Sequence, residues 1–409
     1  MARPLLRGNS GTTRAINRRL IINHLRRFGP TSRSELVEVT GLSPAAVTFV
    51  TAGLIQEGFV VESGLSGSRL RPLDINYSAH FAVGLKLMQH RLCAVLTDFS
   101  TRIVSSLTVP LRRPDPLTVA DTAAAVTGNL IRDTNVRRAG LAGIGLAFPG
   151  IIDIANGVCV QSHRLNWTDV PIASMIAERA KVPVWADNDV NAFAVAEHLF
   201  GHGRKASSLI AVTIGRGVGA GIVLNGQLYH GRHGAAGEFG HIPLVENGRN
   251  CECGRKGCLE AYVSEPALVN ELRTAERRRK RITAEEMARL GTAGDAAVVK
   301  ILGRAGRLLG RGLASLVNLF DPEILVIGGE GVRFGEPLFA PMRSELDRLS
   351  MTPAATVAID VWDDDAWARG AAGLAIQRFF DFEAAGAASH YRPAQGKTNN
   401  RPKLVYSPT

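Results

Sequence analysis

The sequence predicts an α/β protein in which a small helical unit with a β-hairpin precedes a larger two-lobed α/β body. Three observations support this fold class. Helix and turn signals alternate closely in residues 14–76. Segments 81–109 and 208–244 share a pattern of strand, turn, strand, turn and strand, and helices are expected after each of them. A repeated plan of this kind places a cleft, and therefore a ligand site, between two lobes.

The same patterns divide the chain into four regions. We expect a flexible arm at 1–13, the small unit at 14–76, the body at 77–382, and a disordered tail at 383–409 that is rich in Ala, Gly, Pro and Asn. With 409 residues, 45% of them apolar, the chain can bury a sizeable core. No stretch approaches the ~20 apolar residues of a membrane-spanning helix. These features predict a cytoplasmic protein.

The small unit has the order of elements of a winged helix-turn-helix. A first helix is expected at 14–28, where Gly29-Pro30 ends it, and a second at 33–40, before Gly41. Ser43-Pro44 is a cap followed by proline at the first helical position, and it predicts the start of a third helix at 45–57. Segments 59–62 and 70–75 then resemble the two strands of a wing, joined by a Gly/Ser turn.

The third helix of such a unit enters the major groove of DNA and reads bases with its N-terminal side chains. Those side chains are Ser43, Ala45, Ala46, Thr48 and Phe49. Arg69 and Arg71 of the wing are placed to meet phosphate or a minor groove. Residues 1–80 carry ten Arg, no Lys and five acids, a net charge of +5 within a chain total of +11. Double-stranded DNA is therefore favoured over the alternative, a helical bundle for protein contact.

A cysteine cluster in the second half of the body predicts a structural metal. Cys251, Cys253 and Cys258 lie within eight residues, and His241 precedes them. One imidazole and three thiolates form a closed tetrahedral set that suits Zn²⁺. The alternative, three free thiols in a loop, would be a chemical liability. Because four protein ligands leave no open position, we expect this metal to shape a pocket and not to catalyse.

The two halves of the body differ where a nucleotide would be held. In the second half, glycine alternates at 215–221, and glycine lets backbone N–H groups approach a phosphate, although a hairpin with tight turns would also use it. In the first half, the matching turn is Lys86-Leu87-Met88-Gln89-His90, which has no glycine and no acid. Mg²⁺ would find no carboxylate there, and bulky side chains would fill the space of a phosphate.

A polar pair follows the expected strand 182–186 and precedes the expected helix 190–201. Asn188 and Asp189 are well placed there for the hydroxyl groups of a ligand. Capping the helix is the alternative role for these residues, and one of them is expected to serve as the cap.

Taken together, these motifs resemble those of the ROK family (repressors, open reading frames, kinases) over residues ~14–382. The likeness is carried by Asn188-Asp189-x-Asn191, the glycine run 215–221, Glu238-x-Gly240-His241 and Cys251-x-Cys253-Gly254-x-x-Gly257-Cys258-x-Glu260. The resemblance implies an actin-like, ribonuclease-H-like body, a structural zinc and a sugar in the cleft between the lobes. It implies that the sugar is contacted by Asn188, Asp189, Glu238, His241 and Glu260.

The same resemblance separates regulator from kinase. Family kinases carry Asp-x-Gly-Gly-Thr where this chain has Lys86–His90, and their counterpart of Asp189 is the general base. Without a phosphate and Mg²⁺ scaffold, we expect Asp189 to be a relic base and the chain to be no enzyme. Family repressors often show Gly-Gly-Arg in the wing, where this chain has Gly67-Ser68-Arg69.

These inferences converge on a sequence-specific DNA-binding regulator, a repressor of carbohydrate-metabolism genes. We expect a sugar or sugar phosphate as effector and a homodimer or homotetramer as the working form, since a two-fold dimer matches palindromic half-sites. One alternative is an active ATP-dependent sugar kinase with an appended DNA-binding head. Another is a regulator that responds to a protein partner.

Overall fold

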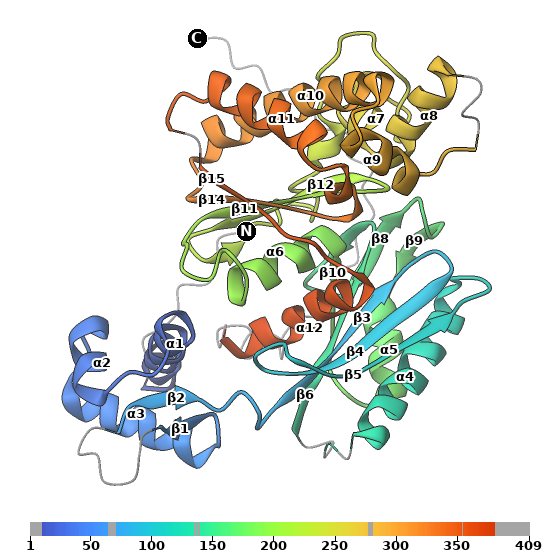
Figure 1. Cartoon of the computed structure of the whole chain (residues 1–409). Coiled ribbons are helices and arrows are strands. Elements are labelled where there is room, and N and C mark those ends of the chain that lie inside the picture. The colour runs from blue at the N-terminus through green and yellow to red at the C-terminus, as the bar shows by residue number, and fades with distance from the viewer. Residues whose placement is uncertain are drawn as a thin grey trace, which may run out of the picture.

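A computed structural model describes residues 10–63, 71–134, 136, 140–276, 281–353 and 355–380. It confirms the mixed α/β class, with an N-terminal helical head and two sheets that each form the centre of a lobe (Figure 1). Residues 1–9 of the arm expected at 1–13, the segment 64–70 that holds the wing turn, and the whole tail expected at 383–409 lie outside the described residues, whereas residues 10–13 of the arm belong to the first helix.

The head has the predicted order of elements, which is α1 (Ser10–Phe28), α2 (Arg33–Thr40), α3 (Pro44–Gln56), β1 (Val60–Glu62) and β2 (Leu73–Ile75). The Ser32 and Ser43 hydroxyls cap α2 and α3 by accepting from Glu35 N and Ala46 N. Strands β1 and β2 pair in antiparallel fashion, as a wing requires. Helix α1 begins four residues earlier than predicted, at Ser10. Both wing strands are shorter than predicted, because pairing covers only Val60–Glu62 and Leu73–Ile75.

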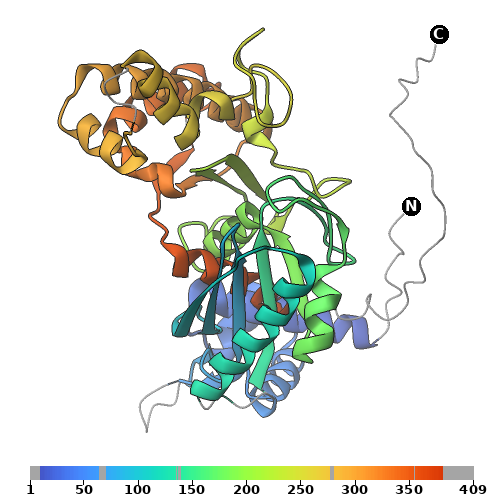
Figure 2. The same cartoon turned by 90° about the vertical axis from the view of Figure 1, so that its right-hand side faces the viewer.

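The first lobe is built on a five-stranded sheet in the order β10-β6-β3-β4-β5. Its elements are β3 (Phe81–Leu87), β4 (Arg91–Asp98), β5 (Ile103–Pro110), α4 (Pro116–Asp133), β6 (Leu141–Phe148), α5 (Ile172–Ala180) and β10 (Val184–Asn188). A small sheet of β7 (Ile151–Asp153), β8 (Val158–Ser162) and β9 (Trp167–Val170) lies between β6 and α5 in the chain. Figure 2 shows α4 and α5 side by side against one face of the large sheet.

The second lobe repeats this plan with a sheet in the order β13-β12-β11-β14-β15. Its elements are α6 (Asp189–Leu199), β11 (Leu209–Ile214), β12 (Val218–Leu224), β13 (Gln227–Leu228), η2 (Phe239–His241), α7 (Glu260–Val263), α8 (Glu265–Ala275), α9 (Ala284–Thr292), α10 (Ala296–Phe320), β14 (Ile324–Gly328), η4 (Glu330–Phe334), α11 (Glu336–Leu349) and β15 (Thr356–Ile359). In both sheets an antiparallel meander is followed by two parallel strands. The duplication expected from the sequence is therefore present. Its third strand in this half, however, is only the two-residue β13.

Two helices form the layer between the sheets. Helix α6 packs on β11 and β12, while α12 (Asp364–Phe380) packs on β3, β6 and α6. Glycine makes both approaches possible. A Cβ at Gly84 would collide with the Ala368 carbonyl of α12, and a Cβ at Gly221 would collide with Ala194 of α6. Part of the glycine run 215–221 thus serves helix packing, a role that the sequence did not indicate.

The described helices differ in length and in apolar character, and both properties decide whether a helix can span a membrane. Within the described residues, no single helix is both long and apolar enough to span a bilayer; α2 and α3 qualify only when joined across their 118° bend, by length and composition.

Glu197, near the end of α6, is a buried carboxyl group with 2% of its surface exposed. Its Oε2 accepts a hydrogen bond from His202 N at 3.0 Å. Burial, together with a hydrogen bond to Asp360, raises the pKa of Glu197 from 4.5 to about 8. Because the folded value lies above the unfolded one, the stability that this group contributes is complete below pH 4.5. It is lost as the pH rises through 8.

We expect Glu197→Gln to stabilise the protein at alkaline pH. The amide keeps an oxygen for His202 N and an N–H for Asp360, so it mimics the protonated acid at every pH. The free energy of unfolding should exceed that of wild type by about 1–3 kcal/mol near pH 8.5 and match it near pH 5. Thermal melts of both proteins between these values check this, and a Tm difference that does not grow with pH would contradict the assignment.

Candidate functional site

Asp189 opens α6 and forms an ion pair with Lys86 of β3, through Nζ and Oδ2. Lys86 lies on the strand, whereas the sequence placed it in the turn; its side chain is 7% exposed and its Nζ lies 4.8 Å from the Trp367 ring centroid. Burial alone would raise the pKa of Asp189. The charges of Lys86 and Arg164, with the N–H of Val190, outweigh it and hold that pKa below its ordinary value. A carboxylate in this state accepts hydrogen bonds from hydroxyl groups but is a weakened base.

Asn188 ends β10 and caps α6. Its Oδ1 accepts from Val190 N at 2.8 Å, and its Nδ2 donates to Gly150 O at 3.0 Å. The expected cap of this helix is therefore Asn188, while its contact with a ligand stays a prediction. The amide is already engaged within the protein, which leaves one N–H and a second oxygen lone pair for a ligand.

The predicted metal ligands converge. His241, Cys251, Cys253 and Cys258 offer ligand atoms that all lie within 4.8 Å of one another, so the cluster could hold a metal ion. His241 Nδ1 is 3.6 Å from Cys251 Sγ, and the sulfurs of Cys253 and Cys258 are 3.7 Å apart. Three residues of the set lie on one loop, and η2 supplies the fourth.

The imidazole of His241 faces two ways. Its Nδ1 lies toward the thiols, while its Nε2 is 3.7 Å from Oε2 of Glu238. Burial raises the pKa of Glu238; the His241 charge acts against this, and Glu260 and Asp189 add to it. The charges of Asp189 and Glu260 therefore both act on Glu238.

Glu260 ties the cluster to the turn between β11 and β12. Its Oε2 accepts from Val218 N at 2.9 Å, and its Oε1 is 4.0 Å from Cys251 Sγ. A Cβ at Gly217 would collide with Oε2 of Glu260 and with the guanidinium of Arg164. Since Arg164 belongs to the first lobe and Gly217 to the second, this contact crosses between the lobes.

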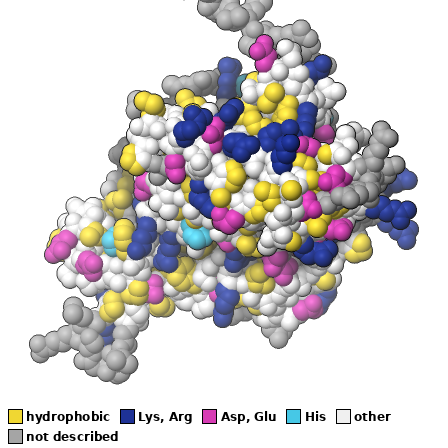
Figure 3. All heavy atoms as spheres, turned by 45° about the horizontal axis from the view of Figure 1, so that its top comes forward, with side chains coloured by type: hydrophobic (Ala, Val, Ile, Leu, Met, Phe, Trp, Pro, Cys, Tyr) yellow, Lys and Arg dark blue, Asp and Glu magenta, His cyan; other side chains and the backbone are white. Residues whose placement is uncertain are grey.

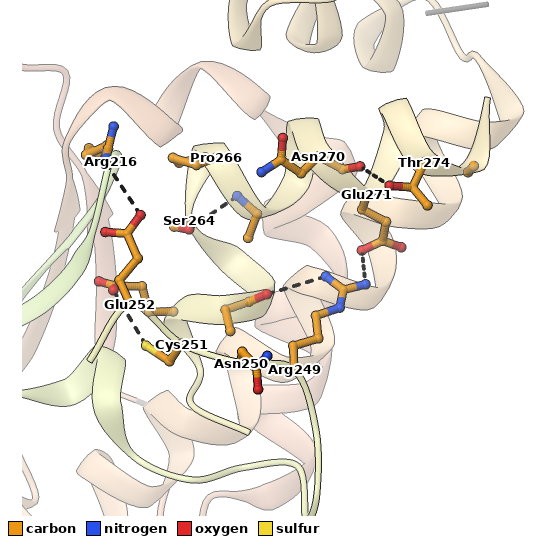
Figure 4. Close-up of a pocket in the computed structure, with 14 residues that line it drawn as sticks. Arg216, Arg249, Asn250, Cys251, Glu252, Ser264, Pro266, Asn270, Glu271 and Thr274 are labelled. Atoms are coloured by element: carbon orange, nitrogen blue, oxygen red, sulfur yellow. Dashed lines mark hydrogen bonds and ion pairs between the residues drawn. The ribbon is translucent and has the colours of Figure 1, made fainter. Parts of the chain in front are cut away.

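A pocket of about 520 Å³ opens on the other side of Glu260, along α7 and α8 (Figure 4). Arg216 and Arg249 line it, yet acids offset both charges: Arg216 lies 3.4 Å from Glu252, and Arg249 lies 2.7 Å from Glu271. Asn188, Asp189, Glu238 and His241 do not line this pocket. Of the five residues predicted to bind sugar, only Glu260 lines it.

The N-terminal half of α3 presents the predicted DNA-reading residues at the surface. Ser43, Ala45, Thr48 and Phe49 are exposed, and Ala46 is half-buried. Phe49 is 63% exposed, and the Arg14 guanidinium carbon lies 5.2 Å from its ring centroid. Arg71 of the wing is exposed and pairs with Glu62 at 3.4 Å, whereas Arg69 lies outside the described residues.

The surface of the second lobe has a different charge pattern. Figure 3 shows its basic side chains interspersed with acidic and apolar ones. Several of them form ion pairs, among them Arg311 and Arg348 with Glu345, and Arg343 with Glu336. Mixed charge of this kind does not make the continuous basic surface that a nucleic acid needs.

Sequence reasoning missed three participants. Lys86 was noted for the acid it replaces, but its pairing with Asp189, 103 residues away, has no local signal. Arg164 reaches the site from the turn before β9. His230 lies 2.8 Å from the buried carboxylate of Asp187, next to Asn188. The contact between Lys86 and Asp189 depends on the strand order, which brings β3, β6 and β10 together.

Comparison with known proteins places this geometry in a family. The model of the ROK family matches residues 83–378. The chain belongs to the ROK family. It is 32% identical over 336 residues to the xylose repressor of Bacillus subtilis, which covers 81% of this chain and 86% of the relative. It is 28% identical to the DNA-binding transcriptional dual regulator NagC of Escherichia coli, over 79% of this chain and 82% of the relative.

A solved structure extends the likeness to the head. A ROK family transcriptional regulator, described as a homolog of the E. coli MLC protein, superposes with a TM-score of 0.82 and 25% identity, covering 92% of this chain and 99% of that one. The chain is thus a ROK-family transcriptional regulator that resembles these repressors.

Proposed function

We propose that the protein is a DNA-binding transcriptional repressor whose affinity for its operator is set by a sugar or sugar derivative bound beside Asp189, without phosphoryl transfer. The ion pair between Lys86 and Asp189 carries the proposal. In this pair the Lys86 ammonium keeps Asp189, which we interpret as a relic base, in its ionised form. A general base needs a pKa near the working pH, and phosphoryl transfer needs Mg²⁺, which a lysine repels. The names of the relatives support repression.

The proposed sugar contacts come from two places in the fold. Asn188 and Asp189 lie at the start of α6, and Glu238 and Glu260 lie near the metal cluster to which His241 belongs. Carboxylates, an amide and an imidazole are the groups that hydroxyl-rich ligands need. The sugar itself differs between the named relatives, since one is a xylose repressor and another an N-acetylglucosamine repressor. The effector of this chain is therefore proposed by class.

We propose that the metal is zinc and that its role is structural. With Zn–S bonds of ~2.3 Å and Zn–N bonds of ~2.0–2.1 Å, a tetrahedron puts two sulfurs about 3.8 Å apart and a nitrogen about 3.6 Å from a sulfur. The corresponding separations here are 3.7 and 3.6 Å. Zinc on Nδ1 of His241 would leave Nε2–H, 3.7 Å from Oε2 of Glu238, to donate to a hydroxyl group of the ligand.

Gel shifts with the DNA upstream of the chain's own gene test the proposal. The protein is titrated alone and with D-xylose, D-glucose, N-acetyl-D-glucosamine and their phosphates, and ATP turnover is measured with each sugar. We expect DNA binding that one sugar changes by about 5–150-fold, with no turnover. Phosphorylation at ordinary kinase rates, or DNA binding that no sugar alters, would refute it. The proposed homodimer would protect two half-sites about one or more helical turns apart.

The DNA-reading surface makes a prediction of its own. Phe49→Ala should weaken operator binding about tenfold without changing its salt dependence, because an apolar contact to a base is lost. Arg71→Ala should also weaken binding, but it should lower the slope of log K against log salt by about 1, since a phosphate contact is lost. Binding isotherms at four salt concentrations separate the two effects.

Phe28→Ala provides the matched control, because Phe28 is a 61% exposed phenylalanine at the end of α1, outside the proposed DNA surface. It should leave DNA affinity unchanged. Equal losses in Phe28→Ala and Phe49→Ala, or an unaltered salt slope in Arg71→Ala, would contradict the assignment of α3 and the wing.

A further inference from the structure

Helix α6 extends from the proposed ligand site to the head. It begins at Asp189, beside Lys86, and ends at Leu199, where α1 lies against it. Its 11 residues span about 16 Å, and those from Asn191 to Leu199 are all buried. A helix enclosed on every side moves as a rigid body, because bending it would break close packing all around it.

Arg26 of α1 makes the contact at the far end of this helix. The residue is 1% exposed, and its Nη1 donates to His198 O at 3.2 Å and to Leu199 O at 2.9 Å. The last carbonyls of a helix have no partners within it, and a cation there also meets the negative end of the helix dipole. The head therefore supplies the C-terminal cap of a helix whose N-terminus forms the ligand site.

Two further contacts hold α1 at the same place. Arg204, in the turn after α6, donates Nε to the backbone oxygen of Arg26 at 2.6 Å. Asn23 donates Nδ2 to the carbonyl of Phe380, at the end of α12, at 3.3 Å. The Phe380 ring centroid lies 5.8 Å from the Arg26 guanidinium carbon. Head and body are thus joined by directional bonds as well as by apolar contact.

We propose that α6 transmits the state of the ligand site to the head and that Arg26 couples the two; the identity of both ends rests on the proposed function. A ligand that bonds to Asp189 competes with Lys86 for its carboxylate and displaces the start of α6. The carbonyls of His198 and Leu199 move with the rigid helix, and Arg26 carries α1 along. This requires that the ligand favour one position of α6 over the other.

The alternative is that Arg26 simply anchors the head. In that case, substitutions at the two ends of α6 act independently. Effects at sites more than ~7–10 Å apart normally add. Transmission along α6 predicts the opposite, because the Arg26 side chain is the contact between α1 and the last carbonyls of α6, and its loss should weaken the effect of Asp189 on the head.

A double-mutant cycle on the full chain separates these readings. Asp189→Asn alters one end of α6, and Arg26→Lys alters the other while keeping its charge, since an ammonium cannot reproduce the guanidinium geometry. The readouts are Kd for the upstream DNA and hydrogen exchange of the α1 amides. Asp189→Asn alone should change Kd by about 5-fold or more, with a parallel change in α1 exchange. In the Arg26→Lys background, the same substitution should change Kd by less than about 2-fold.

Arg18→Lys is the matched control. Arg18 lies on α1, as Arg26 does, but its bidentate pair with Glu57 is a contact within the head and not with the body. It should leave the effect of Asp189→Asn intact. Should Arg26→Lys fail to fold, Arg204→Ala removes the bond to the Arg26 backbone oxygen and should weaken the effect of Asp189→Asn from the body's side. Additive effects, or no effect of Asp189→Asn on either readout, would overturn the proposal. Hydrogen exchange needs neither DNA nor sugar. It therefore tests transmission along α6 even if the protein binds neither, and a failure of the proposed function can be told apart from a failure of this proposal.

Discussion

Lys86→Met is expected to lower the free energy of unfolding by about 3–5 kcal/mol at pH 7, because it removes the direct partner of the largely buried Asp189 carboxylate and leaves Arg164 as the cation that acts on it. The methionine chain retains most of the apolar contact with Trp367. The loss should shrink as the pH falls. The pKa of Asp189, lowered in the wild type, rises once the cation is gone, so the carboxyl of the variant protonates at low pH and no longer carries an unmatched charge.

The double variant Lys86→Met with Asp189→Asn isolates this cause. Neutralising the acid should recover most of the lost stability, since replacing both partners of a buried pair costs far less than removing one. Lys300→Met, at an exposed lysine of α10, should stay within about 0.5 kcal/mol of wild type. Urea melts of the four proteins measure these differences. A double variant no more stable than Lys86→Met would show that the lysine acts by packing and not by charge.

Under the proposed function, the ion pair would account for a body that resembles kinases without their chemistry. An acid at position 86 could bind a cation and thereby a phosphate, but a lysine there binds the base itself. A lysine at this position of β3 offers no ligand to a metal ion, and its charge contributes to the lowered pKa of Asp189. What remains is a carboxylate suited to hydrogen bonding with hydroxyl groups, which is sufficient for recognition.

Local signals predicted the elements of the head well. Residues 33–40 form α2 as expected, and α3 is displaced by one residue, because the Ser32, Ser43 and Pro44 signals act within a single turn of helix. The cysteine cluster was likewise predictable, since three of its ligands lie on one short loop. In each case the information lies within about ten residues of the structure that it specifies.

Contacts between distant segments could not be read in this way. Lys86 meets Asp189, and Arg26 meets Leu199, only because the strand order and the packing of α12 bring these segments together. The glycines at 219 and 221 show the same limit, because a phosphate loop and a helix-packing surface require the same residue. The sequence identifies glycine, but the fold decides which backbone approaches it.

The metal cluster gives the second large prediction. Cys253→Ser should reduce the bound zinc from about one ion per chain to a small fraction, with an affinity loss of at least ~100-fold, or roughly 3 kcal/mol. Since metal binding contributes to folding, the Tm should fall as well, and EDTA should have the same effect on the wild type. Metal analysis of the dialysed proteins and thermal melts provide the measurements.

Loss of zinc should reach the sugar site through His241. Without the metal on Nδ1, the ring is free to turn, and the contact of Nε2 with Glu238 is no longer fixed. Sugar binding, followed by calorimetry, should therefore weaken in Cys253→Ser. Cys159→Ala is the control, because Cys159 is a buried cysteine in the core of the first lobe, and it should keep both zinc and sugar affinity. A Cys253→Ser protein that loses zinc but binds sugar with normal affinity would contradict the assignment of His241 to the sugar site.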